Sequence, residues 1–392
     1  ELCNVYDGTH QTPRYTNSGV MFVSVENIKT LKSDKYISED DFKNEFKTFP
    51  EFGDILLTRI GDVGSANIIL DNIKRAYYVS LALLKPKGIN SLFLLALLSS
   101  DSVQSEIWKR TLHIAFPKKI NKNEISKVIV SKPSILEQKK IGELIYALDQ
   151  IITLHQRKLD KLQATKKALL HEMFPEEGQD KPKRRFKGFT DAWEQRKLDD
   201  VFEIVDGDRG KNYPGTGDFL SNGDVLFLDT GNVRKDGFNF DNRRYIDFNR
   251  DKLLRNGRLI LGDYVLTSRG TLGNLAYYSQ SVYDRYPQVR INSAMLILRV
   301  MNTIKVNNLY LYITLRSNVI NEFMKHNFVG SAQPHITKKE FSSVLLPIPR
   351  QLEEQKMIGD FFDRFEKTIT LHQRKLDKLK NLKQAYLNEM FV

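Results

Sequence analysis

The chain has 392 residues, 41% of them hydrophobic, which is enough for two or three domains with cores of their own. Its 60 basic and 48 acidic residues give a formal net charge of +12, which favours a polyanion such as nucleic acid as a partner. A single cysteine excludes an internal disulfide framework and a cysteine-rich zinc site, and no apolar run approaches the roughly 18 residues that cross a bilayer. We therefore expect a cytoplasmic protein without membrane contact, and a basic protein with no polyanionic partner is the alternative.

Residues 1–132 are predicted to form a mixed α/β domain. Short strands are expected at 20–25 and 55–58, a helical stretch at 89–109, and glycine-containing turns between them. Several of its loops combine basic, amide and aromatic residues, the side chains that neutralise phosphates and contact base edges. The predicted DNA contacts of this domain are Thr9, His10, Thr12, Arg14, Tyr15, Arg59, Lys118 and Lys119.

Residues 133–174 are predicted to form one long helix. Its apolar residues recur in steps of four and three, and this 3.5-residue period is typical of a coiled coil. The predicted seam comprises Ile145, Leu148, Ile152, His155, Leu159 and Leu162. The charged segment at 175–195 is predicted to be a linker, with 181–187 as either a phosphate contact or a solvated tether.

Residues 196–349 are predicted to form a second mixed α/β domain. Strands are expected at 225–228, 264–267 and 294–298, and a helical stretch at 306–325. Its loops have the same chemistry as those of the first domain. The predicted DNA contacts here are Arg209, Lys211, Asn212, Tyr213, Arg243, Arg244, Ser268, Arg269, Gln333, His335 and Lys338.

Residues 350–392 repeat the long helix. The segment Thr153–Leu162, TLHQRKLDKL, recurs without a change as Thr370–Leu379, and such a repeat has to be recognised before a fold is assigned. The second predicted seam comprises Phe362, Phe365, Ile369, His372, Leu376 and Leu379. The two helices are expected to pair antiparallel, so that the fold class is α/β (α+β) with two domain copies related by an internal pseudo-two-fold repeat.

Two polar residues occupy equivalent seam positions in both copies: His155 with His372, and Lys166 with Lys383. The histidines could form a metal or pH site, but polar seam residues more often fix the pairing register. Each helix would be about 60 Å long at 1.5 Å per residue. Because one turn of B-DNA spans about 34–36 Å, the pair could hold two DNA-reading domains about one turn apart.

Looser matches relate the two domains. Asp7–Gly8 parallels Asp206–Gly207, and GDILLTRIGDVG at 53–64 parallels GDYVLTSRGTLG at 262–273. The glycines of these segments are predicted to form turns rather than phosphate loops. The second domain is preceded by RFKGFTDAWEQRKL, whereas the first reaches Asp7 almost at once, so we expect a lead-in of roughly twenty residues to be missing from this sequence.

No catalytic motif is visible. The phosphate-binding GxxxxGK[ST] sequence, a glycine-rich loop for a methyl donor and the tetrad of amino-methyltransferases are all absent. The Glu-Gln-Lys sequences at 137–139 and 354–356 are interpreted as charge on the helix surface rather than as part of a nuclease site. A nuclease remains an alternative that a cleavage assay with Mg²⁺ would exclude.

The combination resembles the specificity subunit of type I restriction-modification systems. The segments that carry the resemblance are DGTHQTPRYTNSG at 7–19, ILEQKKIGELI at 135–145, the duplicated TLHQRKLDKL, RFKGFTDAWEQRKL at 185–198 and GSAQPHITKKEF at 330–341. The resemblance covers nearly the whole chain.

The resemblance implies a noncatalytic subunit that binds no cofactor itself and reads a bipartite, asymmetric site in double-stranded DNA, one half per domain. It implies two modification subunits that use S-adenosylmethionine to methylate adenine, and two restriction subunits that use ATP and Mg²⁺. Outward-facing basic residues of the helices are the expected contacts with the modification subunits: Arg157, Lys158, Lys161, Arg374, Lys375 and Lys378. A basic coiled-coil scaffold without sequence preference is the alternative.

Overall fold

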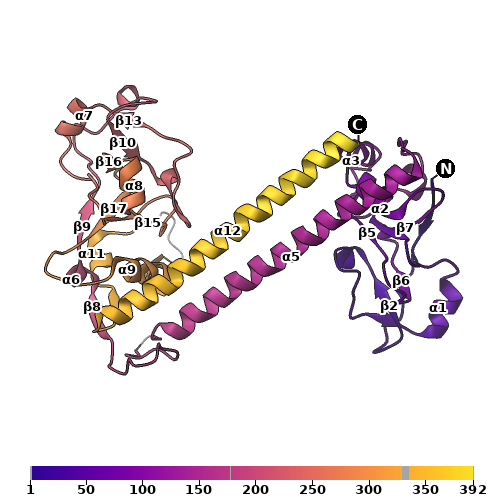
Figure 1. The fold of residues 1–392 in the computed structure, drawn as a ribbon, viewed down its shortest axis with the longest axis horizontal. Helices are drawn as coiled ribbons and strands as arrows, with labels where there is room; N and C mark the ends of the chain where they lie inside the picture. Colours follow the sequence, from indigo (N-terminus) through magenta and orange to yellow (C-terminus); the bar gives the residue numbers. More distant parts are fainter. Residues whose placement is uncertain (1, 177, 329–334, 392) are drawn as a thin grey trace. The chain divides into compact units, whose positions relative to one another are not determined.

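The computed structural model describes residues 2–176, 178–328 and 335–391. The chain divides into two compact units: unit 1 is Glu1–Leu159 with Leu371–Val392, and unit 2 is Asp160–Thr370. Each unit contains one α/β domain and a part of each long helix, α5 (Ile135–Met173) and α12 (Leu352–Met390). The two units are described separately below (Figure 1).

The domain of unit 1 is built on two small sheets. The first is antiparallel, in the order β1 (Cys3–Asp7), β7 (Leu81–Pro86), β4 (Ile55–Thr58) and β5 (Ala66–Ile68). The second has the order β3 (Tyr36–Ile37), β2 (Val20–Val23) and β6 (Arg75–Tyr77), with β2 parallel to β6. The helices of this domain are α1 (Glu39–Glu45), α2 (Ser91–Leu98), α3 (Asp101–Lys109) and α4 (Lys122–Ile125).

Unit 2 repeats this topology. Its antiparallel sheet has the order β15 (Leu275–Tyr277), β14 (Tyr264–Thr267), β17 (Met295–Val300) and β9 (Phe202–Asp206). Its second sheet has the order β13 (Tyr245–Ile246), β10 (Val225–Leu228) and β16 (Val289–Ile291), and β10 is again parallel to β16. The predicted internal repeat and fold class are therefore confirmed.

Unit 2 also contains elements of its own. Two short ribbons pair β8 (Glu194–Lys197) with β18 (Leu345–Ile348), and β11 (Val233–Arg234) with β12 (Gly237–Phe238). Its helices are α6 (Leu198–Val201), α7 (Phe248–Leu253), α8 (Gln280–Arg285), α9 (Asn308–Thr314), α10 (Ile320–Phe328) and α11 (Lys338–Ser342). Its single-turn helices are η2 (Thr216–Asp218), η3 (Thr230–Asn232) and the π-helical η4 (Leu315–Val319), whereas η1 (Val25–Asn27) belongs to unit 1.

The inner strands β4 and β14 are buried along their whole length, because both faces of each four-stranded sheet are covered. In unit 1, Ile55 and Leu57 pack with α2 and the long helices, whereas Leu56 faces the second sheet. In unit 2, Tyr264 and Leu266 likewise pack in the core that includes α9 and α12, and Val265 faces the second sheet. Because successive side chains of a strand point to opposite faces, such a strand lies between two cores.

Two predicted helical stretches are interrupted. The stretch at 89–109 is two helices, because the hydroxyl of Ser100 accepts from Val103 N and begins α3. The stretch at 306–325 is divided by η4 between α9 and α10. The strands predicted at 55–58, 225–228 and 264–267 are confirmed as β4, β10 and β14.

Each long helix is anchored on its own domain by a buried glutamine and a glycine. In unit 1 the Gln138 amide accepts from Asn90 N at 3.0 Å and donates to Pro133 O at 2.8 Å. In unit 2, Gln355 makes the same two bonds, at 2.9 Å with Asn307 N and 2.8 Å with Pro349 O. Figure 1 shows α2 beside the first turns of α5, and Gly142 allows this approach, because a Cβ there would lie 2.5 Å from Phe93 N.

The two long helices run antiparallel, and ion pairs connect them at equivalent positions. In unit 1, Lys383 contacts Asp149 at 2.6 Å across the pair, and in unit 2, Lys166 contacts Glu366. The two lysines are the predicted polar seam residues. Their partners, Asp149 and Glu366, are also equivalent to each other in the repeat. Opposite charges at these positions favour one register of the antiparallel pair over its neighbours.

Seam burial is graded along the helices. Ile145, Leu148, Leu159, Phe362 and Leu376 are buried, whereas the other predicted apolar seam residues are half-buried: Ile152, Leu162, Phe365, Ile369 and Leu379. Ile145, which is 1% exposed, also packs with the domain of unit 1. The helix ends are therefore part of the domain cores as well as of the helix pair.

His155 and His372 face each other in the seam of unit 1, with ring centroids 5.8 Å apart. The Nδ1 atoms of both rings are buried and have no hydrogen-bond partner among the described residues. Burial lowers the pKa of His155, and the neighbouring Lys375, His372 and Lys158 lower it further. The structure therefore favours a neutral imidazole at His155.

Replacing Gly142 by alanine should lower the stability of unit 1. Alanine gains about 1 kcal/mol of helix propensity, but overpacking against immovable backbone costs about 1–3 kcal/mol. We expect a lower midpoint in thermal unfolding followed by circular dichroism. Gly217→Ala is the control, because a Cβ there meets nothing within 4 Å and the midpoint should not change. Equal midpoints for wild type and Gly142→Ala would contradict the close approach.

Acidification should weaken unit 1 through His155. The pKa of His155 is lower in the folded state than in the unfolded chain, so the unfolded chain binds the proton more readily. The free energy of unfolding is therefore unaffected by His155 above the unfolded pKa of about 6.5, and it decreases as the pH falls from there through the folded pKa. Between pH 7.5 and 5.5 the unfolding midpoint of the wild type should therefore fall further than that of His155→Gln. A difference independent of pH would exclude this role.

Candidate nucleic-acid interface

Three loops of unit 1 meet at one edge of its four-stranded sheet. Strands β1 and β4 both run antiparallel to β7, so both end at the same edge. The segments at 8–19 and 59–65 follow these strands. A third segment, 112–119, joins them there, because Gly61 N donates to Lys118 O at 2.8 Å and Leu112 N donates to Lys119 O at 2.7 Å. The sequence predictions had placed candidate DNA contacts on all three.

Most of the predicted contacts in these three segments of unit 1 are exposed. Thr9 is half-buried beside β6, because its N–H donates to Tyr77 O at 3.1 Å. Tyr15 is 46% exposed and touches Phe22 edge-on, with ring centroids 5.7 Å apart. Lys118 lies over the Trp108 ring, 4.7 Å from its centroid. The remaining exposed candidates are His10, Thr12, Arg14 and Lys119.

Arg59 is not part of this exposed set. Its side chain is buried, its guanidinium pairs with Asp7, and its Nε donates to Ile120 O at 3.2 Å. Burial lowers the pKa of Arg59, and the Asp7 carboxylate balances its charge. The predicted DNA contact at Arg59 is therefore corrected to a structural role: this side chain ties the ends of the three loops together.

Unit 2 has the equivalent edge. Strands β9 and β14 both run antiparallel to β17 and end together. Ile336 N donates to Ser268 O at 2.9 Å, which matches the bond of 2.9 Å from Ile120 N to Arg59 O in unit 1. Ser268 thus occupies the position of Arg59, and it is buried as well, so its predicted DNA contact is corrected in the same way.

The other predicted contacts in these segments of unit 2 are exposed or half-buried. Arg209 is exposed, with its guanidinium 3.1 Å from Ser293 O, and Asn212 donates to Leu253 O at 3.2 Å. Tyr213 is half-buried and meets Phe227 edge-on. Lys211, Arg269, His335 and Lys338 are exposed. Gln333 lies outside the described residues.

Arg243 and Arg244 precede β13 and so belong to the second sheet of unit 2. Arg243 donates to the Tyr286 hydroxyl at 3.4 Å, and this bond raises the pKa of the guanidinium. The Arg244 guanidinium lies 5.8 Å from the centroid of the Phe219 ring. Both side chains are exposed, but they lie on a different sheet from the edge formed by β9 and β14.

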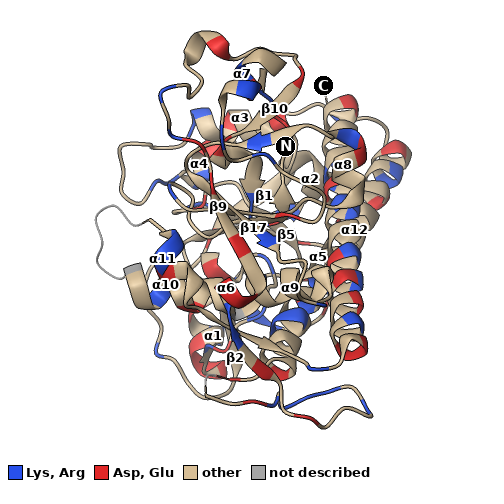
Figure 2. Ribbon diagram, turned by 90° about the vertical axis from the view of Figure 1, so that its left-hand side faces the viewer, with Lys and Arg blue, Asp and Glu red and all other residues tan. Residues whose placement is uncertain are grey.

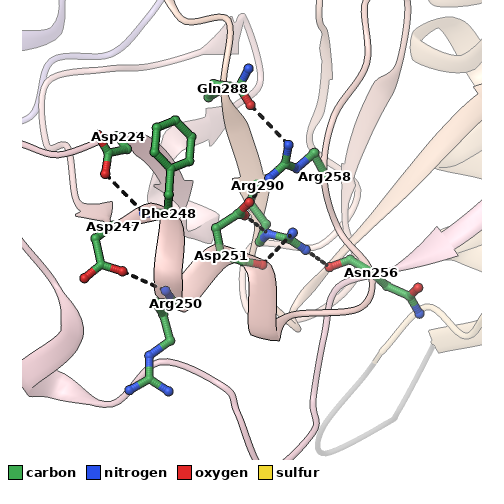
Figure 3. A network of polar contacts seen from close by, with 9 residues as sticks. All are labelled: Asp224, Asp247, Phe248, Arg250, Asp251, Asn256, Arg258, Gln288 and Arg290. Carbon is green, nitrogen blue, oxygen red and sulfur yellow. Dashed lines mark hydrogen bonds and ion pairs between the residues drawn. The ribbon is translucent and has the colours of Figure 1, made fainter.

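A buried ion network joins α7 and the segment that follows it to the second sheet of unit 2 (Figure 3). Asp251, on α7, is completely buried and accepts from Arg290 Nε of β16 at 2.6 Å. Arg258 pairs with the other carboxylate oxygen of Asp251 and donates to Gln288 at 3.3 Å. Burial lowers the pKa of Arg290. The network holds α7 and the segment after it against the second sheet, and no sequence pattern had indicated it.

The segment predicted as a linker is attached to unit 2. Arg185 makes two bonds to the Glu354 carboxylate, at 2.6 and 2.8 Å, and Trp193 is buried in the core. Glu354 is also buried, so its interpretation as helix-surface charge is wrong, whereas the equivalent Glu137 is exposed. The Arg185 guanidinium is occupied by this pair and is not a phosphate contact.

The charge on the long helices is mixed. Figure 2 shows Lys and Arg alternating with Asp and Glu along α5 and α12. The basic residues expected to contact modification subunits are exposed: Arg157, Lys158, Lys161, Arg374, Lys375 and Lys378. Within the described ranges, no group of three or more His, Cys, Asp or Glu side chains could hold a metal ion, and no helix is long and apolar enough to cross a membrane.

Removing the Asp251 carboxylate should destabilise unit 2 strongly. Asp251→Ala leaves the buried Arg290 charge without its partner, which costs about 3–5 kcal/mol. Denaturant unfolding followed by Trp193 fluorescence in a Trp108→Phe background reports on this unit, because Trp193 lies in its core. Asp247→Ala is the control: it removes only the exposed cap of α7, bonded to Arg250 N at 2.7 Å, and should cost about 1 kcal/mol. Equal losses for the two variants would show that the network contributes little.

Comparisons with known proteins agree with this arrangement. A family model described as "Type I restriction modification DNA specificity domain" matches residues 1–164 and 190–381. The MjaVIII type I restriction enzyme specificity subunit of Methanocaldococcus jannaschii is 20% identical over 280 residues, which cover 69% of this chain and 62% of that protein. The putative MjaX specificity subunit of the same organism is 22% identical over 306 residues, covering 76% and 65%. The chain thus spans somewhat less than two thirds of these relatives.

Solved structures share the fold. The S subunit of a type I restriction-modification system from M. genitalium superposes with a TM-score of 0.63 at 15% identity, covering 100% of this chain and 94% of that one. A chain from a structure on complex assembly and conformational transition of the type I R-M system gives a TM-score of 0.50 at 16% identity, covering 99% and 95%. The family model covers both domains and most of both long helices, so the chain belongs to the family of type I restriction-modification DNA specificity proteins.

Proposed function

We propose that this chain is the DNA sequence-specificity subunit of a type I restriction-modification complex. The observation that carries the proposal is the repeated edge: two domains of one topology each present loops at the same sheet edge, and these loops differ in sequence between the domains. Two domains with the same sheet topology but different loop sequences are what a protein needs to read two different half-sites. The surface loops carry the arginine, lysine, amide and aromatic side chains that bind phosphates and base edges.

The chain itself would be noncatalytic. Each domain would read one half of a bipartite, asymmetric site in double-stranded DNA, and the antiparallel helices would set the unread spacer. Two modification subunits, using S-adenosylmethionine, would methylate adenine, and two restriction subunits would use ATP and Mg²⁺ in the cytoplasm. The exposed basic faces of α5 and α12, including Arg157 and Arg374, are the proposed docking surfaces for the modification subunits.

Methylome sequencing tests this proposal directly. The chain would be expressed in a naive host together with the modification subunit from the neighbouring gene, and adenine methylation would be mapped in genomic DNA. One split motif methylated in both halves is the expected result. If the complex assembles and no motif appears, the chain is a scaffold without sequence preference, and its DNA binding should then vanish with added salt regardless of sequence.

Arg269→Ala should relax the specificity of one half-site only. Arg269 is exposed at the loop edge of unit 2, and each lost base contact costs about 1–3 kcal/mol of discrimination. The mapped motif should become degenerate at one or more positions of one half and stay unchanged in the other. Arg350→Ala is the control, since Arg350 is exposed near β18 and pairs with Glu194 at 3.7 Å, away from the loop edge. Degeneracy in both halves would contradict independent reading by the two domains.

A further inference from the structure

The segment at 112–119 of unit 1 ends in an apolar tip. Ile114 and Phe116 are 99% and 104% exposed, the highest values among the exposed large hydrophobic side chains of the described residues. Trp108 and Leu112, at the base of the same segment, are 55% and 42% exposed. Apolar side chains held fully in water are unfavourable, so an exposed cluster of them marks a binding surface.

The base of this apolar tip is held firmly to the sheet edge. Lys119 forms bridges with Leu112 and with Ile60 of the loop that follows β4. The buried Arg59 guanidinium binds Ile120 O directly after the segment, and the Asp7 carboxylate holds that guanidinium. The His113 ring contacts Trp108, with ring centroids 4.2 Å apart. The tip is therefore presented outward from a braced base, at the edge where the proposed DNA contacts lie.

The charge around the tip is positive. Glu106 and Glu124 flank this part of the chain, and the residues between them include Lys109, Arg110, Lys118, Lys119 and Lys122.

 The stretch at 107–123 thus contains five basic side chains and no carboxylate. Lys109 and Arg110 pair with Glu106, at 2.9 and 3.2 Å, whereas the exposed Lys118 and Lys119 adjoin the tip. An apolar tip flanked by lysines matches a nucleic acid, whose bases are apolar on their faces and whose backbone is anionic.

We propose that Ile114 and Phe116 insert between base pairs of the DNA that unit 1 binds, with Lys118 and Lys119 on the flanking phosphates. This inference rests on the proposed function and adds a mode of reading to it. Apolar wedges of Ile, Leu, Phe or Pro unstack a base step, and the cost of unstacking depends on the sequence of that step. The tip therefore contributes specificity through the deformability of one step in the half-site of unit 1.

The test uses the full chain in complex with its modification subunit and a duplex containing the mapped motif. 2-Aminopurine is placed in turn at each purine position of the half-site read by unit 1 except the methylated adenine, because a methyltransferase takes its target base out of the stack. We expect binding to raise the fluorescence at one step, because unstacking relieves quenching of this base. Ile114→Ser/Phe116→Ser should abolish the rise and weaken binding about tenfold or more, since two buried apolar contacts are lost.

Two matched variants accompany this test. Phe116→Leu keeps an apolar tip and should retain most of the fluorescence rise. Phe52→Ser removes another exposed phenylalanine, 65% exposed in the turn before β4 and so at the opposite end of that strand from Arg59, and should change neither signal nor affinity. Because the tip side chains are exposed, all variants should unfold at the wild-type temperature, which thermal unfolding verifies.

The outcomes separate this inference from the proposed function. A wild-type complex that methylates a split motif but shows no fluorescence rise at any position overturns the wedge and leaves the function standing. A double variant that loses assembly with the modification subunit but still binds DNA normally makes the tip a protein contact, which also overturns the wedge. If no motif is found at all, the wedge and the proposed function are overturned together.

Discussion

The structure depends on the close attachment of each domain to its own long helix. Gly142 lets α5 approach the backbone of α2, and Gly359 does the same for α12 and α9, where a Cβ would lie 2.8 Å from Tyr310 N. Gln138 and Gln355 add two hydrogen bonds each at the same junctions. Backbone contact leaves little freedom for rotation, so each domain is fixed in orientation on the adjoining turns of its helix. Changes in the loops can therefore alter the exposed surface without altering how the loop edge is held.

At the loop edges, too, the residues that hold the loops are buried and the residues that differ on the surface are exposed. Arg59 and Ser268 occupy one position of the repeat, and both are buried, although one is charged and the other neutral. Arg59 is balanced by Asp7, whereas unit 2 places its buried ion network elsewhere, between Asp251 and Arg290. At these positions the two domains use different polar groups, whereas Asp54–Lys85 and Asp263–Arg299 form equivalent ion pairs. The exposed residues of the loops are left for contacts with a partner.

Several site predictions depended on residue type, and residue type does not report burial. Arginine is normally exposed, so Arg59 was a reasonable candidate for DNA contact until the structure showed the Asp7 carboxylate beside it. The apolar tip at Ile114 and Phe116 was missed for the complementary reason, because hydrophobic residues in a sequence predict a core. Likewise the sequence predicts Glu354 to be a charged residue on the helix surface. Its buried ion pair with Arg185, which lies far away in the sequence, is known only from the structure.

The sequence by itself determined the repeat, the two long helices, the central strands of both sheets and the family. These features are periodic or local: a 3.5-residue seam, a duplicated segment and apolar strands between glycine turns can be read without knowing which parts of the chain meet. Only the tertiary structure decided which loops share an edge, which charged residues are buried, and that Lys166 and Lys383 pair with Glu366 and Asp149. The reason is physical: burial and ion pairing depend on distances between residues remote in sequence, and those distances exist only once the sheets and helices have packed.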